Sequence, residues 1–232
     1  MATNPFAHII CTPDCFMNNI GKKQIIYNGY HELAYLQNSH YKPNPQVLDE
    51  IGVKATNKYA IIRFVSWQAA HDVGHHGFSI ESKRSLISKI SQHARILITS
   101  ESPLPEEFEK YRIKVSPEKI HDLLYYANIY VGEGGTMASE SAILGTPAVL
   151  MSSLAKFCGT QIDMHSNYDL LYYYDDPELA IQKAVDLIQQ PNLKKEWAEK
   201  RQKLLNDKID VTQFMVDLIE NYPDSLDKIK NT

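Results

Sequence analysis

Cysteine is scarce in this 232-residue sequence, which contains only Cys11, Cys15 and Cys158. A small, odd number of cysteines excludes a disulfide framework and is typical of a protein in a reducing compartment. Cys11 and Cys15 lie close to His8, but a zinc site needs a further ligand pair at regular spacing, and none follows. We therefore interpret the thiols as buried or incidental groups.

Long apolar segments and an excess of one charge are also lacking. No segment approaches the roughly 20 apolar residues of a membrane-spanning helix, and no signal-peptide pattern opens the chain. The net charge is −4, with acidic and basic residues interspersed, whereas general nucleic-acid binders usually carry a basic surface. We expect a cytoplasmic protein with no transmembrane segment and no nucleic-acid partner, and peripheral membrane contact stays open.

What the sequence does contain is an alternation of apolar runs and helix-forming segments. Hydrophobic residues make up 44% of the chain, enough for a substantial core. Strands are predicted at residues 59–65, 95–99, 127–131, 148–151 and 170–174. Helices are predicted at residues 79–92, 116–127, 135–144 and 177–190. This order predicts an α/β fold, with a Rossmann-like parallel sheet covered by helices on both faces.

The two ends of the chain follow a different pattern. Residues 7–12 form a short predicted strand with no preceding element to pair with. Residues 27–36 combine an Asn-Gly turn with one or two helical turns rich in tyrosine and leucine, which indicates a packed crossing. Residues 44–52 predict a short helix. Residues 192–222 are predicted to be helical, with a break near residues 207–210.

A pair of glycines, Gly134 and Gly135, follows the predicted strand at residues 127–131 and opens a helix that stops at Gly145. A helix start offers unpaired N–H groups and a positive dipole end, so the turn suits an anion such as a phosphate. Glu140 lies about one and a half turns further on, where its carboxylate could accept hydrogen bonds from a sugar hydroxyl. The alternative is a turn used only for tight packing.

The second informative segment, residues 63–77, is polar and rich in histidine. Arg63 could present a planar fork to a phosphate, and His71 with Asp72 could form an acid–base pair. Because ligands bind beyond the carboxyl ends of parallel strands, we expect this loop and the glycine turn to face one cleft. The alternatives are a solvated loop or a metal site formed by the loop's histidines, His71, His75 and His76.

Three further side chains are candidates for the same cleft or its surroundings. Glu101 follows a predicted strand and could hydrogen-bond a base or ribose, or it is a polar turn residue. Glu133 would repel a diphosphate unless it points elsewhere or holds a cation. If it points across the cleft toward a second substrate, it is a candidate catalytic residue. His121 is predicted to be a packed or surface histidine.

The motif at residues 133–140, followed by residues 144–147, resembles the nucleotide-sugar site of glycosyltransferase-B-fold proteins. It is similar in particular to hydrolysing and non-hydrolysing UDP-N-acetylglucosamine 2-epimerases. Together with residues 27–36, 63–71 and 120–126, it resembles an uncharacterised bacterial and archaeal family of that fold, often described only as a domain of unknown function. The resemblance covers nearly the whole chain.

The resemblance implies a binding role for the residues of the motif. Gly134, Gly135 and Thr136 would hold the diphosphate of a nucleotide-sugar, and Glu140 would hold the ribose hydroxyls. The nucleotide-sugar, a UDP-sugar by this resemblance, is then the substrate, and no cofactor or metal is required. The epimerases usually have a serine or a similar small residue where this chain has Gly134, and their other catalytic acids have no match here.

The resemblance also implies a division of the chain. Residues 1–42 would be a remnant of an N-terminal domain and an interdomain crossing, residues 43–205 the nucleotide-sugar-binding domain, and residues 206–232 a C-terminal crossing helix and tail. The chain would be a C-terminal half that needs an N-terminal domain or a partner chain.

Three functions stay open at this point. The first is half of a glycosyltransferase in surface polysaccharide or glycoconjugate synthesis. The second is a sugar-nucleotide 2-epimerase, with Glu133 and His71 as the candidate acid and base. The third is a non-catalytic nucleotide-sugar-binding module, and the three differ in whether the chain is part of an enzyme at all.

Overall fold

The computed structural model describes residues 6–54, 56–67 and 76–225. It confirms the predicted α/β fold. A five-stranded sheet has the order β4-β3-β5-β6-β7, and all neighbouring strands are parallel. Its strands are β3 (Tyr59–Phe64), β4 (Arg95–Ser100), β5 (Ile129–Gly132), β6 (Ala148–Met151) and β7 (Leu171–Tyr174).

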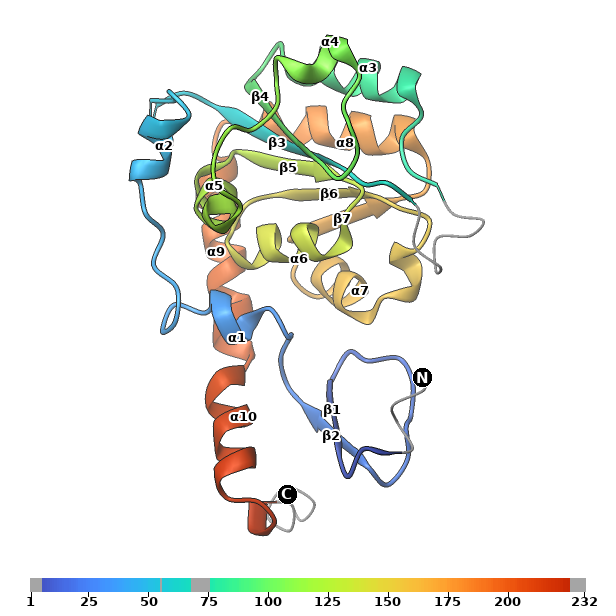
Figure 1. Cartoon of the computed structure of the whole chain (residues 1–232), viewed down its shortest axis with the longest axis vertical. Coiled ribbons are helices and arrows are strands. Elements are labelled where there is room, and N and C mark those ends of the chain that lie inside the picture. Colours follow the sequence, from blue (N-terminus) through green and yellow to red (C-terminus); the bar gives the residue numbers. More distant parts are fainter. Residues whose placement is uncertain (1–5, 55, 68–75, 226–232) are drawn as a thin grey trace.

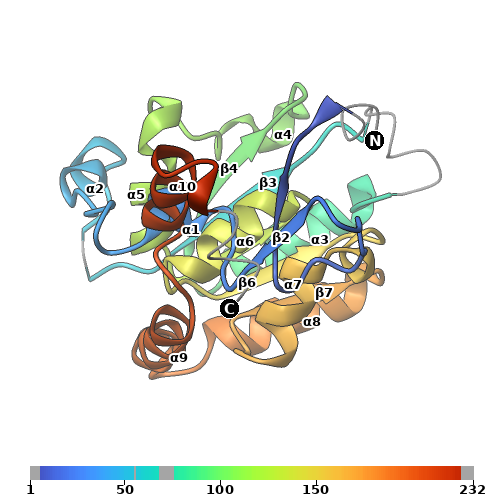
Figure 2. The ribbon, with the colours of Figure 1, turned by 90° about the horizontal axis from the view of Figure 1, so that it is seen from below.

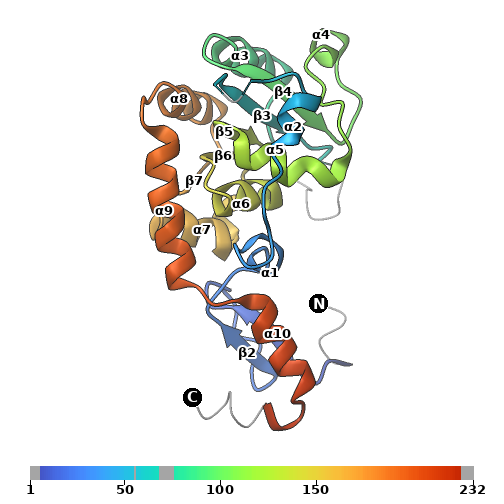
Figure 3. The ribbon, with the colours of Figure 1, turned by 90° about the vertical axis from the view of Figure 1, so that its left-hand side faces the viewer.

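These strands form because short apolar runs can be buried on both faces of a parallel sheet. All residues of β5 and β6 are buried, without the alternation of a sheet that has one face in water. Helices α3 (Ile80–Ile90) and α8 (Pro177–Ile188) cover one face (Figure 1). Helices α5 (Ile120–Tyr126), α6 (Gly135–Ile143) and α7 (Gly159–Ser166) cover the other (Figure 3). The core therefore lies in two layers around the sheet.

A side-chain cap marks the start of some helices but not of others. The Asp176 carboxylate accepts hydrogen bonds from the amides of Glu178 and Leu179, at 2.7 and 3.2 Å, so the predicted start of α8 is confirmed. At the predicted helix 116–127, a 3-10 turn, η2 (Pro117–Lys119), precedes α5, and the Ser116 side chain makes no capping hydrogen bond. The short helix α2 (Gln46–Glu50) lies where it was predicted.

Three helical segments had no prediction: α4 (Glu106–Glu109), the 3-10 turn η3 (Ala155–Phe157), and α7. The start of α7 is fixed by a contact with the N-terminal part of the chain. A Cβ atom on Gly159 would lie 1.7 Å from the carbonyl oxygen of Cys15, so only glycine permits this approach. Since the contact joins segments far apart in the sequence, no local pattern reveals it.

A separate two-stranded parallel sheet is formed by β1 (Ile10–Pro13) and β2 (Gln24–Tyr27), followed by α1 (Leu33–Leu36). The strand predicted at residues 7–12 is β1, which begins three residues later, at Ile10, and its partner β2 follows it in the chain. A parallel pair has no hairpin turn between its strands, so the sequence carried no pairing signal. Figure 2 shows β1 and β2 from below, in front of the main domain.

The C-terminal helices connect the two sheets. Helix α9 (Leu193–Asp207) runs along the main domain, and α10 (Val211–Glu220) continues beside β1 and β2 (Figures 1 and 3). The predicted break is confirmed, since the Asp210 carboxylate caps α10 by accepting a hydrogen bond from the Gln213 amide at 3.0 Å. None of the helices in the described ranges is both long and apolar enough to cross a lipid bilayer.

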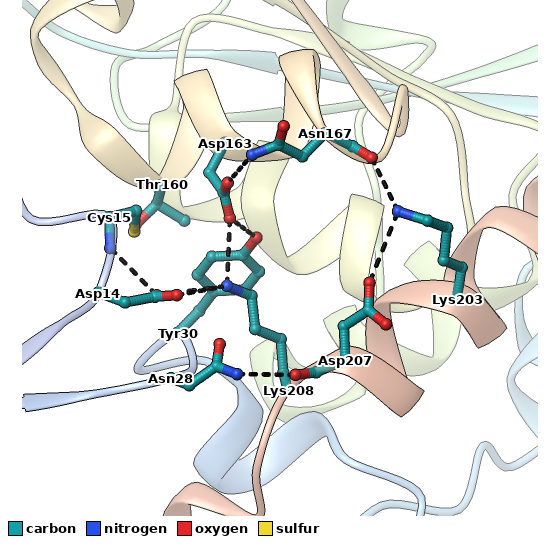
Figure 4. Close-up of polar contacts among 10 residues, drawn as sticks. All are labelled: Asp14, Cys15, Asn28, Tyr30, Thr160, Asp163, Asn167, Lys203, Asp207 and Lys208. Carbon is teal, nitrogen blue, oxygen red and sulfur yellow. Dashed lines mark hydrogen bonds and ion pairs between the residues drawn. The ribbon is translucent and has the colours of Figure 1, made fainter.

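Lys208, between α9 and α10, joins these parts (Figure 4). Its Nζ lies 2.9 Å from Oδ2 of Asp14, which follows β1, and 3.4 Å from Oδ2 of Asp163 on α7. The Tyr30 hydroxyl donates to the same Asp163 oxygen. The Lys208 side chain is only 5% exposed, so a buried cation with two carboxylates holds the small sheet against the main domain.

Candidate functional site

The strand order places a topological switch point between β3 and β5, because the chain moves from β3 to β4 on one side and then to β5 on the other. In open α/β sheets, ligands bind beyond the strand ends at such a point. A cavity of about 560 Å³ lies there. Its lining brings together the predicted residues Glu101, Glu133, Gly134, Gly135 and Thr136. Ser66 and Trp67, at the start of the predicted loop, line the same cavity, and its role as the ligand cleft stays a prediction.

The start of α6 opens into this cavity. Gly134 is the N-cap residue, with φ −88° and ψ 113°, and no side chain of the described residues caps the helix. Its first N–H groups are therefore available to an anion, and the helix dipole favours negative charge there. A Cβ on Gly134 would meet its nearest neighbour, Cγ of Arg63, at 3.5 Å, an ordinary contact. Packing therefore does not require glycine at this position.

The other end of α6 confirms the predicted stop. Gly145 has φ +81°, its amide donates to the Ala142 carbonyl at 3.0 Å, and the Thr146 amide donates to the Ser141 carbonyl at 2.9 Å. These are the two hydrogen bonds of a Schellman motif. The C-terminal end of α6 is therefore fixed by backbone hydrogen bonds before the chain enters β6.

Gln161, on α7, lines the cavity and had no predicted role. Its Nε2 donates to Ser139 Oγ at 3.1 Å and to the Gly135 carbonyl at 3.4 Å. Its Oε1 is buried without a partner among the described residues. An unpaired buried polar atom costs free energy, so this amide is a candidate contact for a ligand.

Glu133 corrects one expectation. Its carboxylate does not point across the cleft: it is buried and accepts hydrogen bonds from the Val65 amide at 2.8 Å and the Phe78 amide at 2.6 Å. Burial raises the pKa of Glu133, opposed by Lys83, whose Nζ is 4.0 Å away, and by the two amides. The carboxylate therefore joins the two ends of the 66–77 loop. Its catalytic role stays a prediction.

His71, the other predicted catalytic residue, lies outside the described residues, as do Asp72 and His75. Their acid–base and metal-binding interpretations stay predictions. In the part of the chain that the structure describes, no group of three or more His, Cys, Asp or Glu side chains is placed to hold a metal ion.

Arg63 and Glu101, both predicted to bind substrate, are paired with each other. Arg63 Nη2 lies 2.6 Å from Glu101 Oε1, and Arg63 Nη1 donates to Thr99 Oγ1 at 2.9 Å. Arg63 also lines a second cavity of about 270 Å³, whose apolar walls include Val115 and Met137. Glu101 lines the larger cavity and Arg63 the smaller one, so the Arg63–Glu101 pair lies between the two.

Glu140 lies on the same face of α6 as Met137, one turn further on. It is buried, and its Oε1 accepts a hydrogen bond from the Tyr35 hydroxyl at 2.9 Å. His121 Nε2 lies 3.0 Å from the same oxygen. The packed histidine predicted at position 121 is thus a partner of Glu140, as is Tyr35 of the crossing. Neither pairing has a signal in the local sequence.

Comparison with protein families supports the family resemblance. The family described as "Protein of unknown function (DUF354)" matches residues 3–224 of the chain. No curated protein sequence matches this chain.

Solved structures of the glycosyltransferase-B type share its fold. The MnaA–UDP co-structure from S. aureus is 11% identical, covers 88% of this chain and 56% of that chain, and gives a TM-score of 0.53. A variant of the wall teichoic acid polymerase TagF soaked with CDPG is 16% identical. The match covers 98% of this chain and 59% of that chain, and its TM-score is also 0.53. The chain thus spans between half and two thirds of their lengths. At these identities the likeness confirms the predicted fold.

Proposed function

The chain belongs to the DUF354 family, and from its site we propose that it forms the nucleotide-sugar-binding half of a glycosyltransferase. The donor would be a UDP-sugar, and the product a surface polysaccharide or glycoconjugate. The observation that carries this proposal is the uncapped start of α6, where Gly134, Gly135 and Thr136 line a cavity of about 560 Å³. Backbone amides at a helix start bind phosphate without a metal ion.

The two cavities suit the two ends of such a donor. The smaller cavity, whose lining includes Val115 and Met137, would take the base. The ribose would lie along α6 toward Glu140, and the diphosphate would lie over Gly134 and Gly135. The sugar would then occupy the larger cavity near Gln161. During transfer the helix start would stabilise the leaving diphosphate, where negative charge develops.

The fold neighbours support the ligand class. The MnaA structure holds UDP, and the TagF structure was soaked with CDPG. Since this chain spans only part of their lengths, we propose that a second domain, in the same protein or in a partner chain, supplies the opposite wall and the acceptor site. The small, odd number of cysteines supports a cytoplasmic location.

Calorimetric titration with UDP, CDP, GDP and ADP tests the donor site. We expect saturable binding of a pyrimidine nucleoside diphosphate, and the absence of binding by all four would refute the proposal. The 2-epimerase alternative shares this site and is separated by its product. Incubation with UDP-N-acetylglucosamine would yield an epimerised sugar, with Glu133 and His71 as candidates for the acid and base. A non-catalytic module would bind the nucleotide in the complete assembly and give no product.

A further inference from the structure

A third cavity, of about 510 Å³, lies at the amino-terminal ends of β3 and β5, opposite the strand ends that face the proposed donor site. It is bounded by the start of β3, the end of α5, the residues after α6, and α9, with Lys58, Tyr125, Gly145 and Arg201 among its lining. Helix α6 has nine residues, so the two ends of the helix are about 13 Å apart. A ligand in this basic cavity would therefore be separate from one at the donor site.

The charge of the lining is one-sided. Lys54, Lys58, Lys194 and Arg201 contribute basic groups, and no Asp or Glu is among the described residues that line the cavity. None of these four takes part in an ion pair within the described ranges. The chain as a whole has a net charge of −4, so a basic surplus here is local.

Lys194 supplies positive charge without a counterion. Its Nζ donates to the carbonyls of Tyr125 and Ala127, at 2.9 and 2.7 Å, and to Thr146 Oγ1 at 3.0 Å. Burial lowers the pKa of Lys194 to about 8. Its donors are used in capping the carbonyl end of α5, so Lys194 acts on a ligand through its field rather than by direct contact.

Arg201 and Lys58 are the groups that can contact a ligand. Arg201 donates from Nε to the Ile143 carbonyl and from Nη2 to Asn38 Oδ1, each at 2.7 Å. Lys58 Nζ donates to the Ile188 carbonyl at 3.1 Å. All of these acceptors are neutral. Arg201 is partly buried without an anionic partner, so a bound anion would offset part of the cost of its charge, and Lys58 is exposed and free to approach such an anion.

We propose that this basic cavity binds a phosphorylated small molecule, with the phosphate between Lys58 and Arg201 and the uncharged remainder against Tyr125 and Tyr126. The volume is in the range of small-molecule sites, roughly 300–1,000 Å³. A phosphate, with up to two negative charges, matches several cations better than a single carboxylate does.

Calorimetric titration of the full chain with inorganic pyrophosphate tests the proposal. The double variant Lys58→Gln/Arg201→Gln is expected to weaken pyrophosphate binding at this site at least tenfold. The matched control Lys22→Gln/Lys195→Gln removes the same charge from exposed positions outside the cavity and should stay within twofold of the unmodified chain. Equal weakening in both variants, or no saturable binding, would overturn the proposal.

Further single variants test whether unfolding or binding at the donor site could explain the result. Lys58→Gln alone removes an exposed side chain and leaves the Arg201 contacts intact, so it should still weaken binding if the double variant unfolds, and Lys58→Arg should restore it. Pyrophosphate could also enter the donor cavity. Titration of Gly134→Ala separates the two sites, because binding at the basic cavity should persist in that variant. Loss of all pyrophosphate binding in Gly134→Ala would contradict a second site.

Discussion

Arg63 Nη2 lies 2.6 Å from Glu101 Oε1, where strands β3 and β4 end beside the cavity of about 560 Å³ that we propose as the donor site. Ser66 donates its amide to the other Glu101 oxygen at 3.2 Å. The Arg63 cation beside the cavity is therefore already matched by a carboxylate. A bound diphosphate would rely mainly on the amides of α6, with Arg63 contributing as far as Glu101 allows.

This pairing predicts opposite effects of two substitutions on UDP affinity. Arg63→Gln should weaken UDP binding about tenfold, because a cation beside the proposed site is lost, while Glu101→Gln should tighten it about threefold by leaving Arg63 unmatched. Calorimetry on both variants measures the change. If Glu101 contacts the base or ribose directly, Glu101→Gln will weaken binding instead, and that result would favour a ligand role for the residue.

Gly134→Ala tests whether a ligand lies close to the backbone of the glycine turn. The added methyl group meets its nearest neighbours at 3.5 Å or more, and the backbone has a negative φ, so we expect little change in melting temperature. A methyl group at the cavity wall should nevertheless weaken UDP binding at least tenfold. Unchanged affinity in a variant with unchanged melting temperature would place the diphosphate elsewhere.

Glu140→Ala should reduce recognition of the ribose. A hydrogen bond to a charged group contributes about 1.5–3 kcal/mol, so UDP affinity is expected to fall roughly tenfold or more. The unmodified chain should also prefer UDP to 2′-deoxy-UDP, and the variant should lose that preference. Tyr35→Phe, which removes a hydrogen bond to the Glu140 carboxylate but keeps the carboxylate, serves as the control and should retain the preference. Equal affinities for both nucleotides in the unmodified chain would refute the ribose contact.

Glu133→Gln tests whether this carboxylate holds the loop. A glutamine can offer only one carbonyl oxygen, so one of the amides of Val65 and Phe78 would face an NH₂ group. We expect faster hydrogen exchange at these two amides, measured by NMR, with the exchange of β5 and β6 amides unchanged. If both amides keep their protection, the loop is held by other contacts.

The main sheet could be predicted because its signals are local. The run at Ala148–Met151 is apolar throughout and starts after a glycine and a proline, so a buried strand is its simplest structure. Strand β2 and helix α7 could not be predicted in the same way. The first pairs with β1 in a parallel register, and the second is held by the contact of Gly159 with Cys15.

The same distinction, between local signals and contacts made only in the tertiary fold, applies to the candidate site. The glycine turn at Gly134 was recognisable because one continuous segment forms it. Gln161, Tyr35 and His121 come from separate elements that only the tertiary fold brings to α6. The orientation of Glu133 was likewise beyond prediction, since it depends on two amides more than fifty residues away along the chain.

The environment of Lys194 predicts how the free energy of unfolding depends on pH. Burial lowers the pKa of its amine in the folded chain to about 8, while an unfolded lysine has a value of about 10.4. Between these values the unfolded chain binds more protons, so the free energy of unfolding rises with pH there. The cost of the buried charge is fully present below pH 8 and disappears toward pH 10.5.

Comparison with Lys194→Met isolates this effect. The variant loses three hydrogen bonds at every pH, but it carries no titrating amine, and Tyr125, Tyr126 and Arg201 of the same cavity are present in both proteins. From pH 7 to pH 10, the unfolding free energy of the unmodified chain should rise relative to that of the variant by on the order of 2 kcal/mol. Urea unfolding at both pH values measures the difference. If the difference between the two proteins stays constant, either the amine is uncharged at pH 7 or a bound anion already compensates its charge. Repeating the measurement in phosphate-free buffer distinguishes these two explanations.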